Sequence, residues 1–113
     1  MRIFEQGQIV RVPFPYTDKT TRQHRPALVI SRTAVGDRQT LLWVVMITSA
    51  ENRGWPGDHD IGPAYRDIGL PARSVIRTSK IATVEMRHAE PVGKISSTLL
   101  EHVAQTIAGI LGR

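Results

Sequence analysis

The sequence predicts a small, strongly bent β-sheet or barrel with one helix packed on it. About five short segments show the apolar patterns of strands, and the last segment changes to the 3.6-residue period of an amphipathic helix. The chain has 113 residues, about the size of one ordinary domain, and 41% hydrophobic with 22% charged residues is a globular composition. We therefore expect a single domain, residues 1–113, with a single hydrophobic core.

The first two strands are predicted on either side of a long loop. Apolar side chains alternate over residues 9–14, but Pro13 has no N–H to donate to a neighbouring strand. We therefore expect this strand to lie at an edge of the sheet or to end in a bulge at Pro13. Residues 16–24 are polar and partly basic, which predicts a loop, and the apolar, β-branched residues 27–30 predict a central strand.

The remaining strands are separated by a second long loop. The strongest strand pattern in the chain covers residues 41–49. Residues 51–63 contain three glycines and two prolines among charged residues, which predicts a loop of the kind that is often functional. Two short strands are expected at 74–77 and 80–84, followed by a turn near 89–93.

The C-terminal segment predicts one amphipathic helix. Its apolar residues recur at intervals of three and four, and they are Leu100, Val103, Ala104, Ile107, Ala108 and Leu111. Thr98 and Glu101 fit a capping box at the start of the helix, and Gly112 fits a stop at its end.

Composition excludes several classes of function. The chain has no cysteine, which excludes disulfides, thiolate metal sites and thiol catalysis. The four histidines lack metal-ligand spacing and no P-loop motif occurs, so we expect no metal and no cofactor. Asp58, His59 and Asp60 could bind a cation, and the alternative is a solvated loop.

Location and partners follow from charge and hydropathy. No apolar run approaches the roughly 20 residues of a membrane span, and no secretory signal is evident, so we expect a cytoplasmic protein without a membrane. A net charge of +5 and a pI near 10.4 favour an anionic partner, either nucleic acid or an acidic protein.

Three residues at the ends of the predicted strands are candidates for chemistry. Arg25 precedes Pro26, which favours extended backbone and fixes the guanidinium at the rim of the sheet, where it could bind two phosphate oxygens. The alternative is a surface arginine or a structural ion pair. Thr48 and Ser49 place two hydroxyl groups where a strand leaves the core, whereas Trp43 in the same run is expected inside the core.

Four segments of the chain are informative together. They are GQIVRVPFPYTD, RPALVIS, a strand ending ITSA, and GLPARSVIRTSKIATV. In this order they resemble the MazF/PemK family of toxin endoribonucleases from toxin–antitoxin systems, over residues 7 to about 111. The resemblance implies an SH3-like β-barrel with a C-terminal helix, a homodimer, and metal-independent cleavage of single-stranded RNA at short sequences. It also implies that Arg25 is the catalytic arginine and Thr48 its hydroxyl partner.

The implied reaction needs few protein groups, because an RNA 2′-hydroxyl can attack its own neighbouring phosphate. Arg25 would stabilise the negative charge that develops on the phosphorus centre, and Thr48 would donate a hydrogen bond to a phosphate oxygen. An arginine is a poor base in water, because its guanidinium keeps its proton at any pH near neutral. Either its environment is unusual or His24 helps to accept the proton.

The candidate RNA contacts come from the two loops and the strand ends. They are Lys19, Arg22, Gln23, Ser49, Arg53, Trp55, Arg77 and Lys80. The first three could follow phosphates, and Arg53 with Trp55 could stack on or clamp a base. The alternatives are a partly buried loop anchor for Trp55 and solvated strand ends for Arg77 and Lys80.

The resemblance also implies a protein partner and leaves a second function open. A separately encoded antitoxin with a tail rich in Asp and Glu would match a basic groove and compete with RNA. The alternative function is that of a non-catalytic, CcdB-like toxin that poisons DNA gyrase from the same fold. Toxins of that kind use an aromatic residue near the chain end, whereas this chain ends ILGR.

Overall fold

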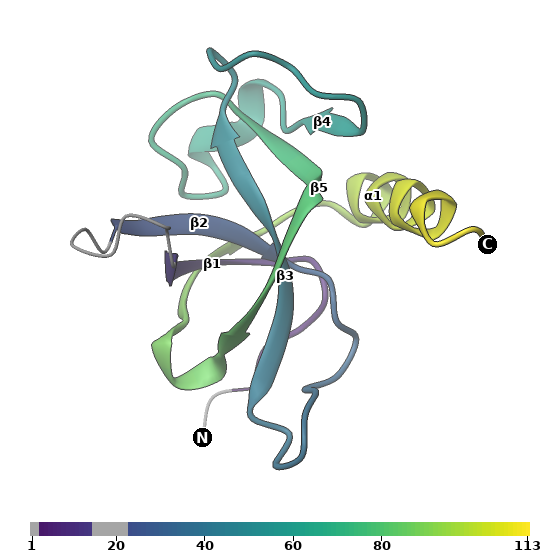
Figure 1. Ribbon diagram of the computed structural model, residues 1–113. Helices are drawn as coiled ribbons and strands as arrows, with labels where there is room; N and C mark the ends of the chain where they lie inside the picture. The colour runs from purple at the N-terminus through teal and green to yellow at the C-terminus, as the bar shows by residue number, and fades with distance from the viewer. Residues whose placement is uncertain (1–2, 15–22) are drawn as a thin grey trace.

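The computed structural model describes residues 3–14 and 23–113, which fold into a twisted antiparallel sheet and one helix (Figure 1). The strands are β1 (Gln8–Phe14), β2 (Gln23–Val29), β3 (Leu41–Ser49), β4 (Asp58–Asp60), β5 (Ser74–Glu85) and β6 (Glu90–Lys94), and the helix is α1 (Ser97–Ile110). The strand order is β4-β5-β3-β2-β1-β6. Short 3-10 helices cover Pro63–Arg66 and Met86–His88. The predicted class, mainly β with a C-terminal helix, is confirmed.

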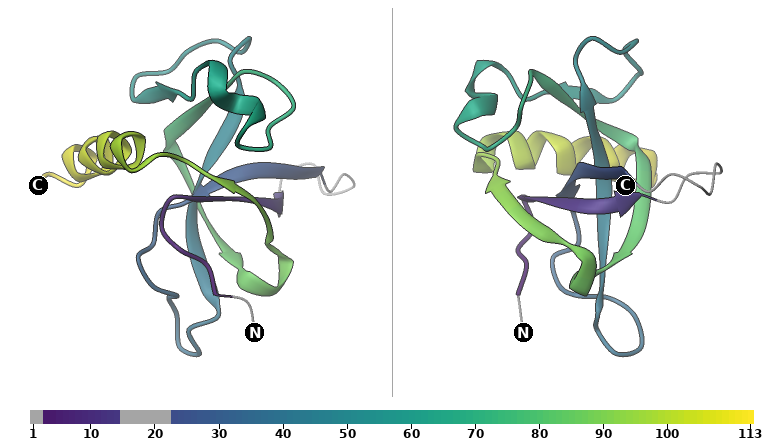
Figure 2. Two further views of the ribbon diagram at one scale, coloured as in Figure 1. Left: turned by 180° about the vertical axis from the view of Figure 1, so that it is seen from behind. Right: turned by 90° about the vertical axis from the view of Figure 1, so that its left-hand side faces the viewer.

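The sheet separates two groups of buried side chains, because successive residues of a strand point to opposite faces. The first core contains Phe4, Val10, Val12, Ala27, Val29, Leu42, Val44, Met46, Val84 and Ala89. The second core contains Ile9, Leu28, Val45, Ile47, Ile61, Leu70, Ile76, Ile95 and Val103. Helix α1 lies beside the sheet and closes the second core through Val103 (Figures 1 and 2). The predicted single core is therefore divided by the sheet.

The first strand is interior, so the prediction of an edge strand is wrong. β1 pairs with β2 on one side and with β6 on the other. Pairing with β6 ends at Arg11 and Glu90, two residues before Pro13, so the missing N–H interrupts no ladder on that side. The bulge lies earlier, between Ile9 and Val10.

Several predicted loops and turns belong to the sheet. Gln23 and His24 begin β2 rather than ending a loop, and part of the second loop forms β4, which pairs with β5. The two strands predicted at 74–77 and 80–84 are one strand, β5. Arg77 and Ile81 of β5 pair with two adjacent residues of β3. The three polar residues between them have no partner in β3 and form a bulge. The expected turn near 89–93 is strand β6, which pairs with β1.

Trp43 is the clearest error in the predicted core, because its side chain is 48% exposed. The strand around it is apolar on both faces, which predicted burial. Trp43 points to the face of the sheet on which α1 packs, but it lies at the edge of the area that the helix covers. The prediction failed because the sequence does not show how far along β3 the helix reaches.

The helix starts slightly earlier than the capping box predicted. Ser96 is its N-cap, and its Oγ accepts a hydrogen bond from the N–H of Leu99 at 3.2 Å. Gly112, with φ of 83°, follows the C-cap in the left-handed conformation, as predicted. No helix in residues 3–14 or 23–113 is long and apolar enough to cross a membrane.

Candidate active site

Arg25 and Thr48 lie on the same face of the sheet, just past the paired part of two neighbouring strands. The last residues that pair between β2 and β3 are Ala27 and Met46, and both belong to the first core. Arg25 and Thr48 each follow that pair by two positions outward, so strand alternation keeps them on the face of the first core. Figure 1 shows β2 and β3 diverging beyond their paired segment. The two side chains therefore stand at the rim of the first core, where the strands separate.

Arg25 extends from a well-fixed part of the sheet. It pairs directly with Val12 of β1, a completely buried residue of the first core. Arg25 itself is half-buried, so the base of its side chain packs against the sheet while part of it stays accessible. This combination suits a cation that must bind an anionic group at a defined position.

The Thr48 hydroxyl is oriented by a residue that sequence reasoning missed. Asn52 Nδ2 donates a hydrogen bond to Thr48 Oγ1 at 2.7 Å. Because this bond occupies an acceptor position of the hydroxyl, the Thr48 hydrogen is left to donate elsewhere. Thr48 ends a strand and Asn52 lies four residues further on in a loop, and this spacing gives no pattern that could have predicted the bond. Ser49, on the opposite face, accepts a hydrogen bond at Oγ from the N–H of Glu51.

Arg77 is held in a buried cluster, so it is not the solvated strand end that one of its two alternatives predicted. Its side chain is 9% exposed, and its guanidinium donates to both carboxylate oxygens of Asp58 at 3.2 and 3.0 Å. It also donates to the carbonyl oxygen of Arg53 at 2.7 Å, and it lies 4.3 Å from the ring centroid of Trp55. Arg77 is therefore neither a solvated strand end nor an exposed contact for phosphate.

The cluster also keeps Asp58 ionised. Burial alone would raise the pKa of this carboxyl, but hydrogen bonds from Arg77 and from the N–H of Trp55 outweigh it and hold the pKa below its usual 3.8. Both partners of the ion pair are nearly buried, so solvent screens them weakly. Asp58 and Arg77 are 19 positions apart in the sequence, so no local sequence pattern predicted that they pair.

The possible cation site around Asp58, His59 and Asp60 is not assembled. Asp60 pairs with Arg73 at 3.1 Å, and the hydrogen bond from Arg73 lowers the pKa of Asp60. His59 Nε2 lies 2.7 Å from Thr106 Oγ1 of α1. Within the part of the chain that the structure describes, no group of three His, Asp or Glu side chains could hold a metal ion.

The other predicted site residues are scattered around this end of the sheet. Trp55 is half-buried in the loop between β3 and β4 (residues 50–57, the β3–β4 loop), and the Arg53 side chain in the same loop is exposed. Lys80 is exposed at the bulge of β5. His24 is exposed and pairs with Pro13, so it points to the face opposite Arg25. Lys19, Arg22 and the side chain of Gln23 lie outside the described residues.

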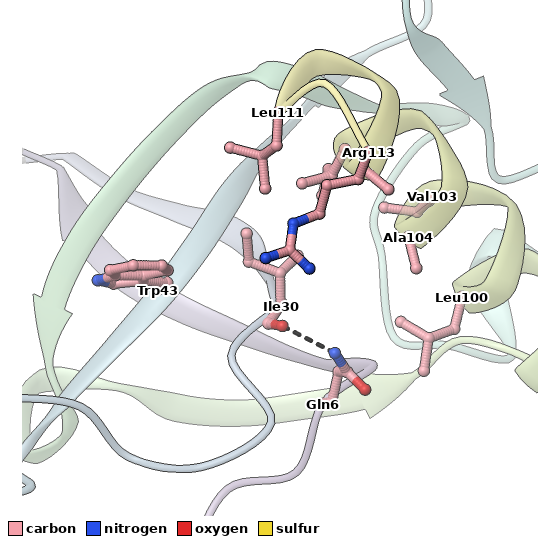
Figure 3. A pocket seen from close by; sticks show the side chains of 10 residues that line it. Gln6, Ile30, Trp43, Leu100, Val103, Ala104, Leu111 and Arg113 are labelled. Atoms are coloured by element: carbon pink, nitrogen blue, oxygen red, sulfur yellow. Dashed lines mark hydrogen bonds between the residues drawn. The ribbon is translucent and has the colours of Figure 1, made fainter.

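A separate apolar pocket lies between α1 and the sheet, with a volume of about 330 Å³ (Figure 3). Figure 3 shows Trp43 on one side of Ile30 and the helix residues Val103 and Ala104 on the other. Gln6 Nε2 donates to the carbonyl oxygen of Ile30 at 2.9 Å and closes one end. This pocket is on the face of the second core, so it is distinct from the Arg25 and Thr48 site.

Comparison with known proteins gives a consistent family. Residues 5–111 match the model of the PemK-like, MazF-like toxins of type II toxin–antitoxin systems. MazF of Deinococcus radiodurans is 23% identical, with a TM-score of 0.77 and complete coverage of both chains. A MazE–MazF complex of that organism gives 22% identity over 99% of this chain and 98% of the other, with a TM-score of 0.75. A mycobacterial endoribonuclease in complex with its cognate antitoxin is 19% identical over 96% of this chain and 94% of the other, with a TM-score of 0.72. A search of curated proteins gave no match.

Proposed function

Because this chain belongs to the PemK-like, MazF-like toxins of type II toxin–antitoxin systems, we propose that it is a sequence-specific, metal-independent endoribonuclease. It would cleave single-stranded RNA in the cytoplasm and thereby inhibit growth. The observation that carries the proposal is the placement of Arg25 and Thr48 on one face of two diverging strands. Solved structures of similar fold include proteins named as endoribonucleases.

The reaction uses the substrate's own nucleophile. The 2′-oxygen of a ribose loses its proton to a base and attacks the adjacent phosphorus, and the bond from phosphorus to the 5′-oxygen breaks as that oxygen takes up a proton from water. The products are a 2′,3′-cyclic phosphate and a free 5′-hydroxyl. Arg25 stabilises the charge on the non-bridging oxygens, and Thr48, held by Asn52, donates its hydrogen bond to one of them. Neither step requires a metal ion or a protein nucleophile.

Two residues are candidates for accepting the proton of the 2′-hydroxyl, namely Arg25 and His24. Strand alternation turns His24 to the face opposite Arg25, which counts against His24 as the acceptor. A residue at the rim of the first core is also closer to the atoms that react than a solvated one on the far face. The pH dependence of a His24 variant distinguishes the two candidates.

The proposed partners are anionic. A net charge of +5 favours both RNA and an acidic antitoxin, which would compete for the same cationic surface. The proposed RNA contacts are Lys19, Arg22, Gln23, Ser49, Arg53, Trp55 and Lys80. Structures similar to this chain include a toxin bound to MazE and an endoribonuclease bound to its cognate antitoxin.

We also propose a homodimer whose interface includes the apolar pocket on the second-core face. Trp43, Ile81, Ile110 and Leu111 are large apolar side chains that are 48 to 70% exposed. The strand register places Trp43 and Ile81 diagonally on one face, next to the pocket beside α1. Among the described residues that line the pocket, Arg113 is the only charged one, so a second copy of this surface suits the pocket better than a polyanion.

The proposed activity is tested with purified protein and a long single-stranded RNA in EDTA. Discrete fragments with 5′-hydroxyl ends are expected, and Arg25→Ala should abolish them. A substrate with deoxyribose at the cleavage position should resist, since it has no 2′-hydroxyl. Intact RNA together with stalled DNA gyrase would instead support the CcdB-like alternative.

A further inference from the structure

Trp55 and the ion pair behind it form a structure that the cleavage chemistry does not use. We propose that the indole of Trp55 is a stacking platform for one RNA base, and that Arg77 and Asp58 are positioning residues that hold it. The proposal rests on the proposed function, because it concerns how that same RNA is selected. It also resolves the two alternatives predicted for Trp55, since a residue anchored on one side can still bind a base on the other.

The geometry of the cluster fixes the plane of the indole. The Arg77 guanidinium lies 4.3 Å from the ring centroid and covers one face of the ring. Trp55 is only half-buried, so another part of its surface stays accessible. A base binding there would meet an aromatic surface with a cation behind it, an arrangement typical of single-strand binding.

The charge of Arg77 is already satisfied, so phosphate binding does not explain it. Asp58 accepts two hydrogen bonds from the guanidinium and a further one from the N–H of Trp55 at 2.9 Å. The carbonyl oxygen of Arg53 accepts another from Arg77. One carboxylate therefore ties together the cation and the backbone of the residue that carries the ring.

The rest of the β3–β4 loop is fixed in the same manner. Asn52 is bonded to Thr48 at one end, and the Thr78 hydroxyl donates to the carbonyl oxygen of Gly57 at 2.8 Å near the other. Gly57 has φ of 90°, and a Cβ atom there would lie 2.7 Å from the Thr78 hydroxyl. A loop held at both ends loses little conformational entropy when RNA binds.

The platform lies beside the proposed catalytic groups. Asp58 pairs with Arg77, Arg77 pairs with Met46, and Thr48 is two residues further along β3 on the same face. Thr48 and Arg77 are thus diagonal neighbours, whose Cα atoms are typically about 7 to 8 Å apart. A base stacked on Trp55 would belong to a nucleotide close to the phosphate at Arg25 and Thr48.

A purely stabilising role explains the cluster less well. Buried ion pairs often contribute little more to stability than apolar side chains of similar size would. Arg77 and Asp58 do supply what apolar residues cannot, which is a fixed direction for each hydrogen bond. We therefore assign the pair to positioning the ring.

The test measures binding and cleavage separately. In a Trp43→Phe background Trp55 is the remaining tryptophan of the two in the chain, so its fluorescence reports on the ring alone. The binding probe is a single-stranded 2′-O-methyl oligonucleotide that carries the mapped cleavage sequence. If the protein cleaves no RNA, so that no sequence can be mapped, the probe is a random pool of the same length. We expect saturable quenching of Trp55. Trp55→Ala should weaken binding and raise KM about 5- to 100-fold with kcat changed less than threefold, and Trp55→Phe should restore most of the loss.

The positioning residues have a matched control. Arg77→Met and Arg77→Lys should both raise KM and shift the emission of Trp55, because each loses the bidentate contact with Asp58. Arg73→Met removes the neighbouring ion pair with Asp60, which is more than half exposed and has no indole above it, so KM should stay unchanged. Thermal melting establishes whether each variant folds. If an Arg77 variant does not fold, Asp58→Asn is used in its place.

The outcomes separate this proposal from the proposed function. Cleavage by the native protein with no effect of Trp55→Ala on KM, or with unquenched Trp55 at saturation, would overturn the platform while the nuclease stands. Quenching with no cleavage of any RNA would overturn the nuclease while the platform stands.

Discussion

Replacing Thr48 by valine tests the proposed mechanism most directly, because it removes one oxygen and keeps the shape of the side chain. In the described part of the chain the hydroxyl accepts a hydrogen bond from Asn52 at 2.7 Å, and Asn52 is exposed. After the substitution water can bind the freed amide, so the free energy of unfolding should fall by less than about 1 kcal/mol. The loss of a hydrogen bond to the phosphate oxygen in the transition state should cost about 3 to 4 kcal/mol, or a factor of 10² to 10³ in kcat.

The assay is the initial rate of cleavage of a fluorogenic single-stranded RNA, combined with urea unfolding of the same samples. Thr48→Ser keeps the hydroxyl and should retain kcat within about tenfold. Asn52→Ala keeps the hydroxyl but frees its direction, so a smaller loss is expected than for Thr48→Val. Full activity of a folded Thr48→Val variant would refute the role of this hydroxyl.

Four further predictions concern the charge, the base, the ion pair and the dimer. Arg25→Lys keeps the charge but loses the planar, bidentate contact, so kcat should fall about 100-fold or more in the same assay, and near-native activity would contradict the assigned role. His24→Gln should leave the pH–rate profile unchanged, because His24 points away from Arg25, whereas loss of one limb of the profile would identify it as the base. The pKa of Asp58 is lower in the folded protein than in the unfolded chain, so its stabilising effect is complete above the unfolded value and is lost as pH falls below about 4. Urea unfolding from pH 7 to pH 3 should therefore show a smaller loss of stability for Asp58→Asn than for the native protein, and equal losses would contradict the effect of the ion pair. Trp43→Glu should weaken the proposed dimer about 30-fold or more, measured by analytical ultracentrifugation, and an unchanged dimer would place the interface elsewhere.

The sequence by itself determined the features that depend on neighbouring residues. Alternating and continuous apolar runs identified most of the strands, and the helical period identified α1. The position of Arg25 before a proline and of Thr48 at the end of a strand were also readable, because strand ends are local features. The family resemblance was confirmed over residues 5–111.

The tertiary structure decided how those segments meet. The sequence could not show that β1 is interior, or that β5 is a single strand with a bulge. Nor could it show that Arg77 of β5 lies opposite Asp58 of the neighbouring strand β4. Register and pairing depend on partners far along the chain, and a shift by one residue would turn every side chain to the other face. The apolar strand around Trp43 predicted that this side chain is buried. It is exposed because α1 does not cover the whole length of β3, which depends on tertiary packing.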